Sequence, residues 1–117
     1  MAIVVKTDEP AALVAAIKKG IDDEKITLWL HDSDGDFTRT DEAWKGKAWL
    51  RPVIRDDRVI FRIFPPRNTV MSKSLYAVYH ARFIEMLLRN FDGLFSEAIA
   101  TALAKHGDQV NTQSKQR

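Results

Sequence analysis

The segment from Lys47 to Phe64 reads KAWLRPVIRDDRVIFRIF, and it decides the fold because it predicts two strands with a single register. Apolar and polar residues alternate in both arms, as in a strand with one buried face. The pair Asp56-Asp57 supplies a two-residue turn, which sets Leu50 opposite Ile63. One face of this hairpin is therefore apolar and is predicted to cover a core.

The opposite face of the same hairpin gathers cations and aromatic rings. The register pairs Trp49 with Phe64, Arg51 with Arg62, and Arg55 with Arg58 on that face. Like charges directly opposite each other cost a few tenths to about 1 kcal/mol per pair unless another group neutralises them. We expect Trp29 and His31 of an earlier strand to point to the same side. Together these residues form a candidate binding face.

The chemistry of this face has three interpretations. Cations beside flat rings are what single-stranded nucleic acid requires for phosphate contact and base stacking. Carboxylates of the same chain would instead neutralise the arginines and leave the tryptophans in a second small core, and the candidates are Asp41, Glu42, Asp56 and Asp57. Arginine and tryptophan are also enriched at protein interfaces. The pattern therefore indicates a polyanion site, a protein interface or an internally neutralised face.

Residues 25–40 predict an earlier hairpin. Apolar and polar residues alternate over residues 25–31, and Asp34-Gly35 then supplies a tight turn, because both residues tolerate a positive φ. Residues 36–40 return as a short strand. The core face of the whole sheet is then predicted to carry Ile26, Leu28, Leu30, Leu50, Ile54, Val59, Phe61 and Ile63.

Acidic residues at alternate positions make the turn of this hairpin look like the start of a calcium loop. Asp32, Asp34 and Asp36 have the spacing with which an EF-hand loop begins. Such a loop needs glycine at its sixth position and glutamate at its twelfth, where this chain has Phe37 and Ala43. We therefore predict a solvated hairpin tip without a metal site, with weak binding of Mg²⁺ or Ca²⁺ as the alternative.

A first helix is predicted after a possible strand over residues 3–6. The segment from Thr7 to Pro10 combines a capping residue, two acids and a first-turn proline, which together favour a helix start. The apolar stripe of this helix comprises Leu13, Val14 and Ile17. Gly20 is expected to end it as a left-handed cap.

A second, longer helix is predicted from Ser72 to Asn90. Its polar residues Arg82, Glu85 and Arg89 share a narrow sector, so apolar side chains cover more than half of its circumference. Soluble monomers rarely leave such a surface open. We therefore expect the chain to self-associate through this helix, most simply as a twofold dimer.

Two further expectations concern the same region. His80 falls inside the apolar sector of the long helix, which predicts a buried histidine with one hydrogen-bonded nitrogen. Asp92-Gly93 should break the helix, and a final helix is predicted over residues 94–105, with His106 at its end.

Composition places the chain among globular proteins. Its 117 residues are 45% hydrophobic and 29% charged, the size and balance of one domain. We predict a single domain over residues 1–106 and a disordered polar tail over residues 107–117. The absence of cysteine excludes disulfides and thiolate metal sites, and no apolar run approaches the length of a membrane span. A cytoplasmic location is expected.

The predicted fold is α+β: an N-terminal helix, an antiparallel meander sheet of about four strands, a long C-terminal helix and a further helix, in a two-layer sandwich. The order of helix, antiparallel strands and helix resembles that of the double-stranded RNA-binding domain. The lysine-rich helix start of that family has no counterpart in residues 70–74, which contain one lysine. We assign no family from the sequence.

A non-enzymatic protein-interaction or regulatory module that self-associates is the first expectation for function. A nucleic-acid or polyanion binder acting through the basic aromatic face is the second. A small-ligand-binding protein or hydrolytic enzyme is the third, and it is disfavoured because the chain has no nucleophile elbow, glycine-rich phosphate loop or HExxH pair. No cofactor is expected.

Overall fold

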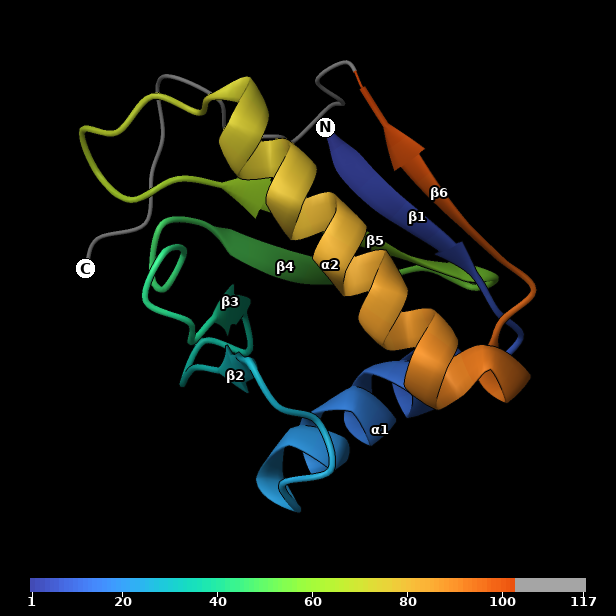
Figure 1. The fold of residues 1–117 in the computed structure, drawn as a ribbon. Coiled ribbons are helices and arrows are strands. Elements are labelled where there is room, and N and C mark those ends of the chain that lie inside the picture. Colours follow the sequence, from blue (N-terminus) through green and yellow to red (C-terminus); the bar gives the residue numbers. More distant parts are fainter. Residues whose placement is uncertain (103–117) are drawn as a thin grey trace.

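Six antiparallel strands build one sheet in the order β2-β3-β4-β5-β1-β6, in a computed structural model that describes residues 1–102 (Figure 1). The strands are β1 (Ala2–Lys6), β2 (Trp29–His31), β3 (Phe37–Arg39), β4 (Trp49–Ile54), β5 (Arg58–Phe64) and β6 (Glu97–Thr101). The helices are α1 (Pro10–Asp22) and α2 (Lys73–Phe91), and a 3-10 turn, η1 (Asp92–Leu94), precedes β6. The α+β class is confirmed, with a larger sheet than the four strands expected.

The hairpin of β4 and β5 has the register that its two-residue turn predicts. Leu50 pairs with Ile63, and the N–H of Arg55 donates to the carbonyl of Arg58 at 2.9 Å. The following neighbour of β5 is β1, so the strand that opens the chain lies inside the sheet. Strands β2 to β5 form the expected meander, and β1 and β6 extend it.

Both helices lie against the same face of the sheet, and the core fills the space between them (Figure 1). The largest fully buried side chains are Tyr79, Phe37, Phe61, Phe83, Ile3, Leu13, Ile17, Leu50, Ile63, Leu87, Val5 and Val59. Aromatic rings make the central contacts, with ring centroids 4.7 Å apart for Phe61 and Phe83 and 5.1 Å apart for Trp29 and Phe83. Helix α1 starts at Pro10 and buries its predicted stripe of Leu13, Val14 and Ile17.

The end of α1 differs from the prediction. The helix continues to Asp22, and the left-handed residue beyond it is Glu24, with φ 61°, rather than Gly20. Gly20 permits a close approach instead, because a Cβ there would lie 2.7 Å from Cδ1 of Ile26. Its carbonyl accepts the N–H groups of Lys25 and Ile26, which turns the chain back toward the sheet.

The strand predicted over residues 25–31 is shorter, and its two faces are exchanged. Leu28 has a left-handed φ of 69°, which interrupts the alternation between Ile26 and Trp29. Both of those side chains are buried, at 5% and 4% exposure, whereas Leu28 and Leu30 are 49% and 38% exposed. The predicted core face was therefore wrong for these two leucines. Ile54 does lie on the predicted face, opposite the buried Val59, but at the end of β4 it stays 47% exposed.

The predicted final helix is wrong within residues 94–102. Residues Glu97–Thr101 form β6, which pairs with β1 along its whole length, from Ala2 to Lys6. Alanine and glutamate favour an isolated helix, but an unpaired edge of β1 would leave backbone groups without partners, and the tertiary pairing prevails. The expected break at Asp92-Gly93 is confirmed as η1. The remaining expectations, for residues 103–106 and the tail over residues 107–117, lie outside the described part of the chain.

Helix α2 matches the predicted long helix. Ser72 is its N-cap, and Oγ accepts the N–H of Leu75 at 3.1 Å. His80 is 4% exposed and its Nδ1 donates to the carbonyl of Tyr76 at 2.7 Å, as expected for a buried histidine. Most of the apolar arc is covered within the fold, although Leu88 stays 54% exposed. Within residues 1–102, neither helix combines the length and apolar character that crossing a membrane requires.

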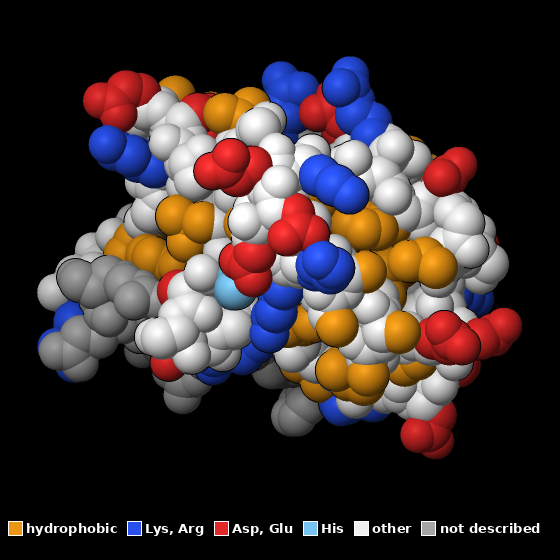
Figure 2. Space-filling view, turned by 90° about the horizontal axis from the view of Figure 1, so that it is seen from below, with side chains coloured by type: hydrophobic (Ala, Val, Ile, Leu, Met, Phe, Trp, Pro, Cys, Tyr) orange, Lys and Arg blue, Asp and Glu red, His pale blue; other side chains and the backbone are white. Residues whose placement is uncertain are grey.

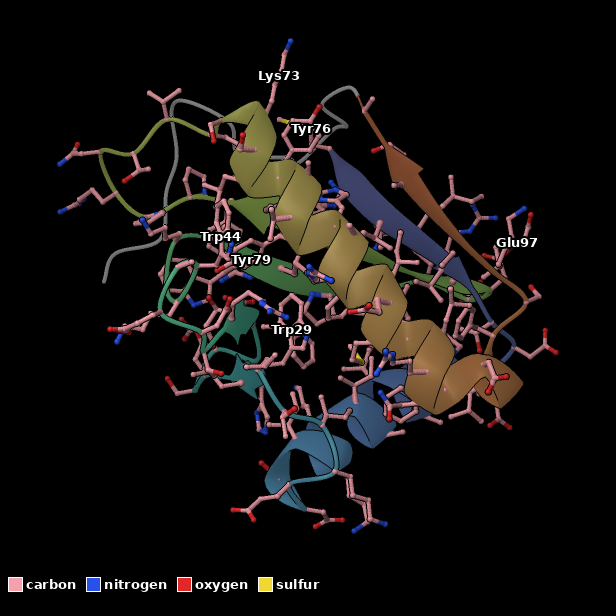
Figure 3. All side chains as sticks on the ribbon, viewed as in Figure 1. Trp29, Trp44, Lys73, Tyr76, Tyr79 and Glu97 are labelled. Atoms are coloured by element: carbon pink, nitrogen blue, oxygen red, sulfur yellow. The ribbon has the colours of Figure 1, made fainter. Side chains whose placement is uncertain are left out.

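A polar network joins α2 to the loop between β3 and β4. Figure 3 shows Tyr79 between Trp29 and Trp44, on the side of α2 that faces β2 and β3. The hydroxyl of Tyr79 donates to the carbonyl of Trp44 at 2.5 Å and lies 3.1 Å from Oγ1 of Thr38. Thr38 in turn donates to the carbonyl of Ala48 at 2.7 Å. The network satisfies carbonyls of a loop that has no strand partner.

Candidate interaction surface

The face of the sheet turned away from the helices carries three rows of side chains across β4, β5, β1 and β6. The strand pairing places Val53, Ile60, Val4 and Ile99 in the middle row, Arg51, Arg62, Ala2 and Thr101 in one flanking row, and Arg55, Arg58, Lys6 and Glu97 in the other. We call this surface the open sheet face. Ile99 is 41% exposed and the other aliphatic residues of the middle row are half-buried. The open sheet face is therefore an aliphatic strip with charged groups along both sides.

The carboxylate of Asp36, directly before β3, neutralises Arg51 of the open sheet face. Asp36, fully buried, accepts two hydrogen bonds of 2.9 Å from Nε and Nη2 of Arg51. The hydrogen bond with Asp36 raises the pKa of Arg51 further above its usual range. The guanidinium also lies over the ring of Phe64, 4.9 Å from its centroid. The repulsion expected between Arg51 and Arg62 is thereby reduced.

Two more cations of the face have partners in their own chain. Arg58 donates to both carboxylate oxygens of Asp57, at 2.9 and 3.0 Å, and this hydrogen bonding lowers the pKa of Asp57 below the value ordinary for an aspartate. Lys6 lies 3.1 Å from the carboxylate of Glu97 on the neighbouring strand. These pairs are exposed to water, so each adds little to stability.

The remaining cations of the face are less well matched. Within residues 1–102, Arg55 is exposed and has no carboxylate within ion-pair distance. Arg62 is half-buried, and its Nε has no hydrogen-bond partner in the same part of the chain. Within residues 1–102, three of the five cations of the open sheet face are thus matched by carboxylates, and Arg55 and Arg62 are in excess.

The aromatic residues of the predicted binding face are not displayed on it. Trp49 and Phe64 do face each other and stack, with centroids 6.4 Å apart and planes at 23°, but each is only 4% exposed. Trp29 and His31 lie on the helix side of the sheet. The left-handed backbone at Leu28 interrupts the alternation, so the side chains that follow it lie on the opposite face from the predicted one. Their predicted position on the basic face was wrong.

Trp29 instead contacts α2, and His31 contacts the end of α1. The ring of Trp29 packs edge-on against Tyr79 and Phe83 of α2, with centroids 5.8 and 5.1 Å apart. Nε2 of His31 lies 2.8 Å from Oδ1 of Asp22, at the end of α1. These contacts connect β2 to both helices.

The acidic hairpin tip brings three carboxylates together. Oxygens of Asp32, Asp34 and Asp36 lie within 4.8 Å of one another, so these residues are the ones that could hold a cation among those described. Oδ1 of Asp32 already accepts the N–H groups of Asp34 and Asp36, at 2.9 and 3.0 Å, and Asp36 binds Arg51. The carboxylates of Asp32 and Asp36 therefore already accept hydrogen bonds within the turn and the sheet.

The aliphatic strip is the feature of this surface that the sequence did not reveal. Val53 and Ile60 belong to the recognised hairpin, but Val4 and Ile99 join them from strands far apart in the chain. The alternation of residues 2–6 was too short to assign two faces, and residues 97–101 were predicted to be helical. Only strand pairing assembles the row.

Comparison of the chain with known proteins finds no match among family models, curated proteins or solved structures. No relative therefore supplies a function.

Proposed function

We propose that the chain is a protein-interaction module that forms a twofold dimer through the open sheet face. The observation that carries this proposal is the aliphatic strip of Val53, Ile60, Val4 and Ile99, which continues across four strands. Sheets that pack face to face bury such strips about 10 Å apart, with strand directions aligned to within about 30°. Exposed aliphatic surface of this kind is typical of interfaces.

The carboxylates already bound to three cations of the open sheet face favour a second copy over a strongly anionic partner. Arg51, Arg58 and Lys6 are each matched by a carboxylate of their own chain. A nucleic acid would have to displace these carboxylates, and the open sheet face presents no well-exposed ring for base stacking. On the side of the molecule that carries α1, hydrophobic side chains lie among charges of both signs (Figure 2).

Under one symmetry operation the two ends of the charged row meet groups of opposite charge, whereas in its interior Arg58 lies over Lys6 of the second copy. A twofold axis parallel to the strands, midway between β5 and β1, reverses the strand order of the second copy and keeps each row over itself. Val53 then lies over Ile99 of the second copy, and Arg55 lies over Glu97 of the second copy. Because a twofold interface repeats every contact, both ends of the charged row are matched.

The experiment exchanges the charges of Arg55 and Glu97. Arg55→Glu alone places two carboxylates at each end of the row, and Glu97→Arg alone places two cations there. Each variant should associate at least about tenfold more weakly than the wild type. An equimolar mixture of the two variants should associate again, because every Glu then meets an Arg. Sedimentation equilibrium at high micromolar concentration measures all four samples.

The control is Lys73→Glu, an exposed charge at the start of α2 and away from the sheet face. It should leave association unchanged, and circular dichroism should show all variants folded. A monomeric wild type at high micromolar concentration would refute the dimer. A dimer whose affinity ignores both single variants would place the interface elsewhere, with Leu88 on α2 as the next residue to replace.

A further inference from the structure

We infer that a cleft between α2 and the loop leading into β2 is a binding site for a small molecule that carries a phosphate group. The cleft has a volume of about 200 Å³ and lies on the helix side of the sheet. Its cationic lining residues are Lys25, Arg39, Arg82 and Arg89, and Glu85 is its carboxylate. This inference does not depend on association through the open sheet face.

The rim of the cleft is cationic because of helical spacing. Arg82 and Arg89 are seven residues apart on α2, so they project on the same side of the helix. Arg82 is only loosely matched by Glu85, at 3.5 Å, and within residues 1–102 neither Lys25 nor Arg89 has a carboxylate partner. Lys25 approaches from the opposite wall, on the loop before β2.

The base of the cleft holds a buried guanidinium with donors to spare. The side chain of Arg39 is 8% exposed, and its Nε donates to Oδ1 of Asp41 at 2.9 Å. Its carbon Cζ lies over the ring of Trp29, 5.2 Å from the centroid, which holds the guanidinium plane in place. Within the described residues, the two terminal nitrogens of Arg39 have no hydrogen-bond acceptor.

Those two nitrogens form a fork that matches the oxygens of a phosphate or carboxylate. A buried side chain with unused donors, facing a cleft with three more cations, suits a doubly charged oxyanion better than a singly charged one. The volume is smaller than that of pockets for drug-sized ligands, so the cleft has room for a phosphate group and a few attached atoms only. The lining also includes the apolar side chains of Ile26, Trp29 and Met86, which would contact the carbon atoms next to the phosphate.

The wall of the cleft also stores backbone strain. Leu28 has φ 69°, a conformation that leucine disfavours, and its carbonyl accepts the N–H of Thr40 at 3.1 Å. Strained residues persist only where surrounding contacts compensate their cost, and they cluster at binding sites. Here the reversal at Leu28 turns Trp29 inward, and that ring supports Arg39.

Titration with inorganic phosphate tests the site. Two-dimensional NMR spectra recorded at constant ionic strength should show saturable shifts of the Trp29 indole and of the Arg39 Nε–H, and acetate should produce smaller ones. Lys25→Gln and Arg89→Gln are exposed substitutions that should each weaken phosphate binding about two- to tenfold. Lys73→Gln, at the other end of α2, is the matched control and should bind like the wild type.

Arg39→Lys keeps the charge and removes the fork, so it should weaken phosphate binding more than either rim variant. If that variant does not fold, Lys25→Gln and Arg89→Gln still decide the question. Linear shifts spread over many charged residues, or equal losses in Lys73→Gln and Arg89→Gln, would overturn the site. Stronger binding of acetate than of phosphate would overturn the ligand class.

Discussion

Asp36 and Arg51 form a two-point ion pair in which the carboxylate is fully buried and the guanidinium reaches the open sheet face. The pair connects the turn before β3 to β4, where the strands themselves share a single residue pair, Phe37 with Leu50. The ion pair between Asp36 and Arg51 thus helps to hold the short strand β3 beside β4. From the sequence, Arg51 was a candidate for binding an external anion. In the structure it binds Asp36, which lies fifteen residues earlier in the chain.

Removal of Arg51 should therefore be costly. Arg51→Met removes two hydrogen bonds from the buried carboxylate of Asp36 and should lower the free energy of unfolding by about 1–3 kcal/mol, less than for a wholly buried pair, because the Arg51 side chain is 47% exposed. Arg55→Met, on the same face and without a partner among residues 1–102, should change it by less than about 0.5 kcal/mol. Urea denaturation measures both, and equal effects would contradict the pairing.

Tyr79→Phe tests the network between α2 and the β3–β4 loop. Loss of the hydroxyl removes the shorter of two hydrogen bonds to the carbonyl of Trp44, which also accepts the N–H of Lys47 at 3.3 Å, and the free energy of unfolding should fall by about 1–2 kcal/mol. Tyr76→Phe is the matched control, since Tyr76 is half-buried on the same helix, and it should be nearly neutral. Thermal melts compare the two, and an unaffected Tyr79→Phe would mean that water replaces the hydroxyl.

Leu28→Asn should stabilise the protein. Asparagine tolerates the left-handed conformation better than leucine, and the Leu28 side chain is 49% exposed, so the free energy of unfolding should rise by a few tenths to about 1 kcal/mol. The same change at Leu30, in regular strand geometry, should instead destabilise. A loss of stability in Leu28→Asn would show that the leucine side chain outweighs its backbone strain.

Asp57 should titrate at a lower pH than an ordinary aspartate. Its hydrogen bonds with Arg58 lower its pKa in the folded state, so their contribution to stability is present above the unfolded-state pKa and is lost as the pH falls through the folded value. Carboxyl-carbon NMR titration should give an Asp57 midpoint that rises in Arg58→Gln. An identical midpoint in the two proteins would remove Arg58 as the cause.

Local signals accounted for several elements correctly. The turn at Asp56-Asp57 predicted the β4–β5 register, and Pro10 predicted the start of α1, although the N-cap is Glu9, without a side-chain cap hydrogen bond, rather than Thr7. Ser72 predicted the start of α2. Each of these depends on residues within a few positions of one another, where backbone geometry and nearby hydrogen bonds dominate.

The candidate site was predicted in part. The pairs Arg51 with Arg62 and Trp49 with Phe64 stand where the turn places them. Their chemical state could not be inferred, because the acid that binds Arg51 comes from another hairpin and the burial of the two rings depends on the whole fold.

The sequence by itself determined the starts of α1 and α2, the hairpin register and the polar side of α2, because turn chemistry, a first-turn proline and periodicity act over short stretches of chain. Only the tertiary structure decided that residues 97–101 form a strand, since that choice depends on the open edge of β1 about ninety residues earlier. It also decided the side on which Trp29 lies, because the core formed with Tyr79 and Phe83 compensates the left-handed backbone at Leu28. Burial against distant partners outweighed the local alternation there, and it brought Trp29 and Arg39 together at one cleft.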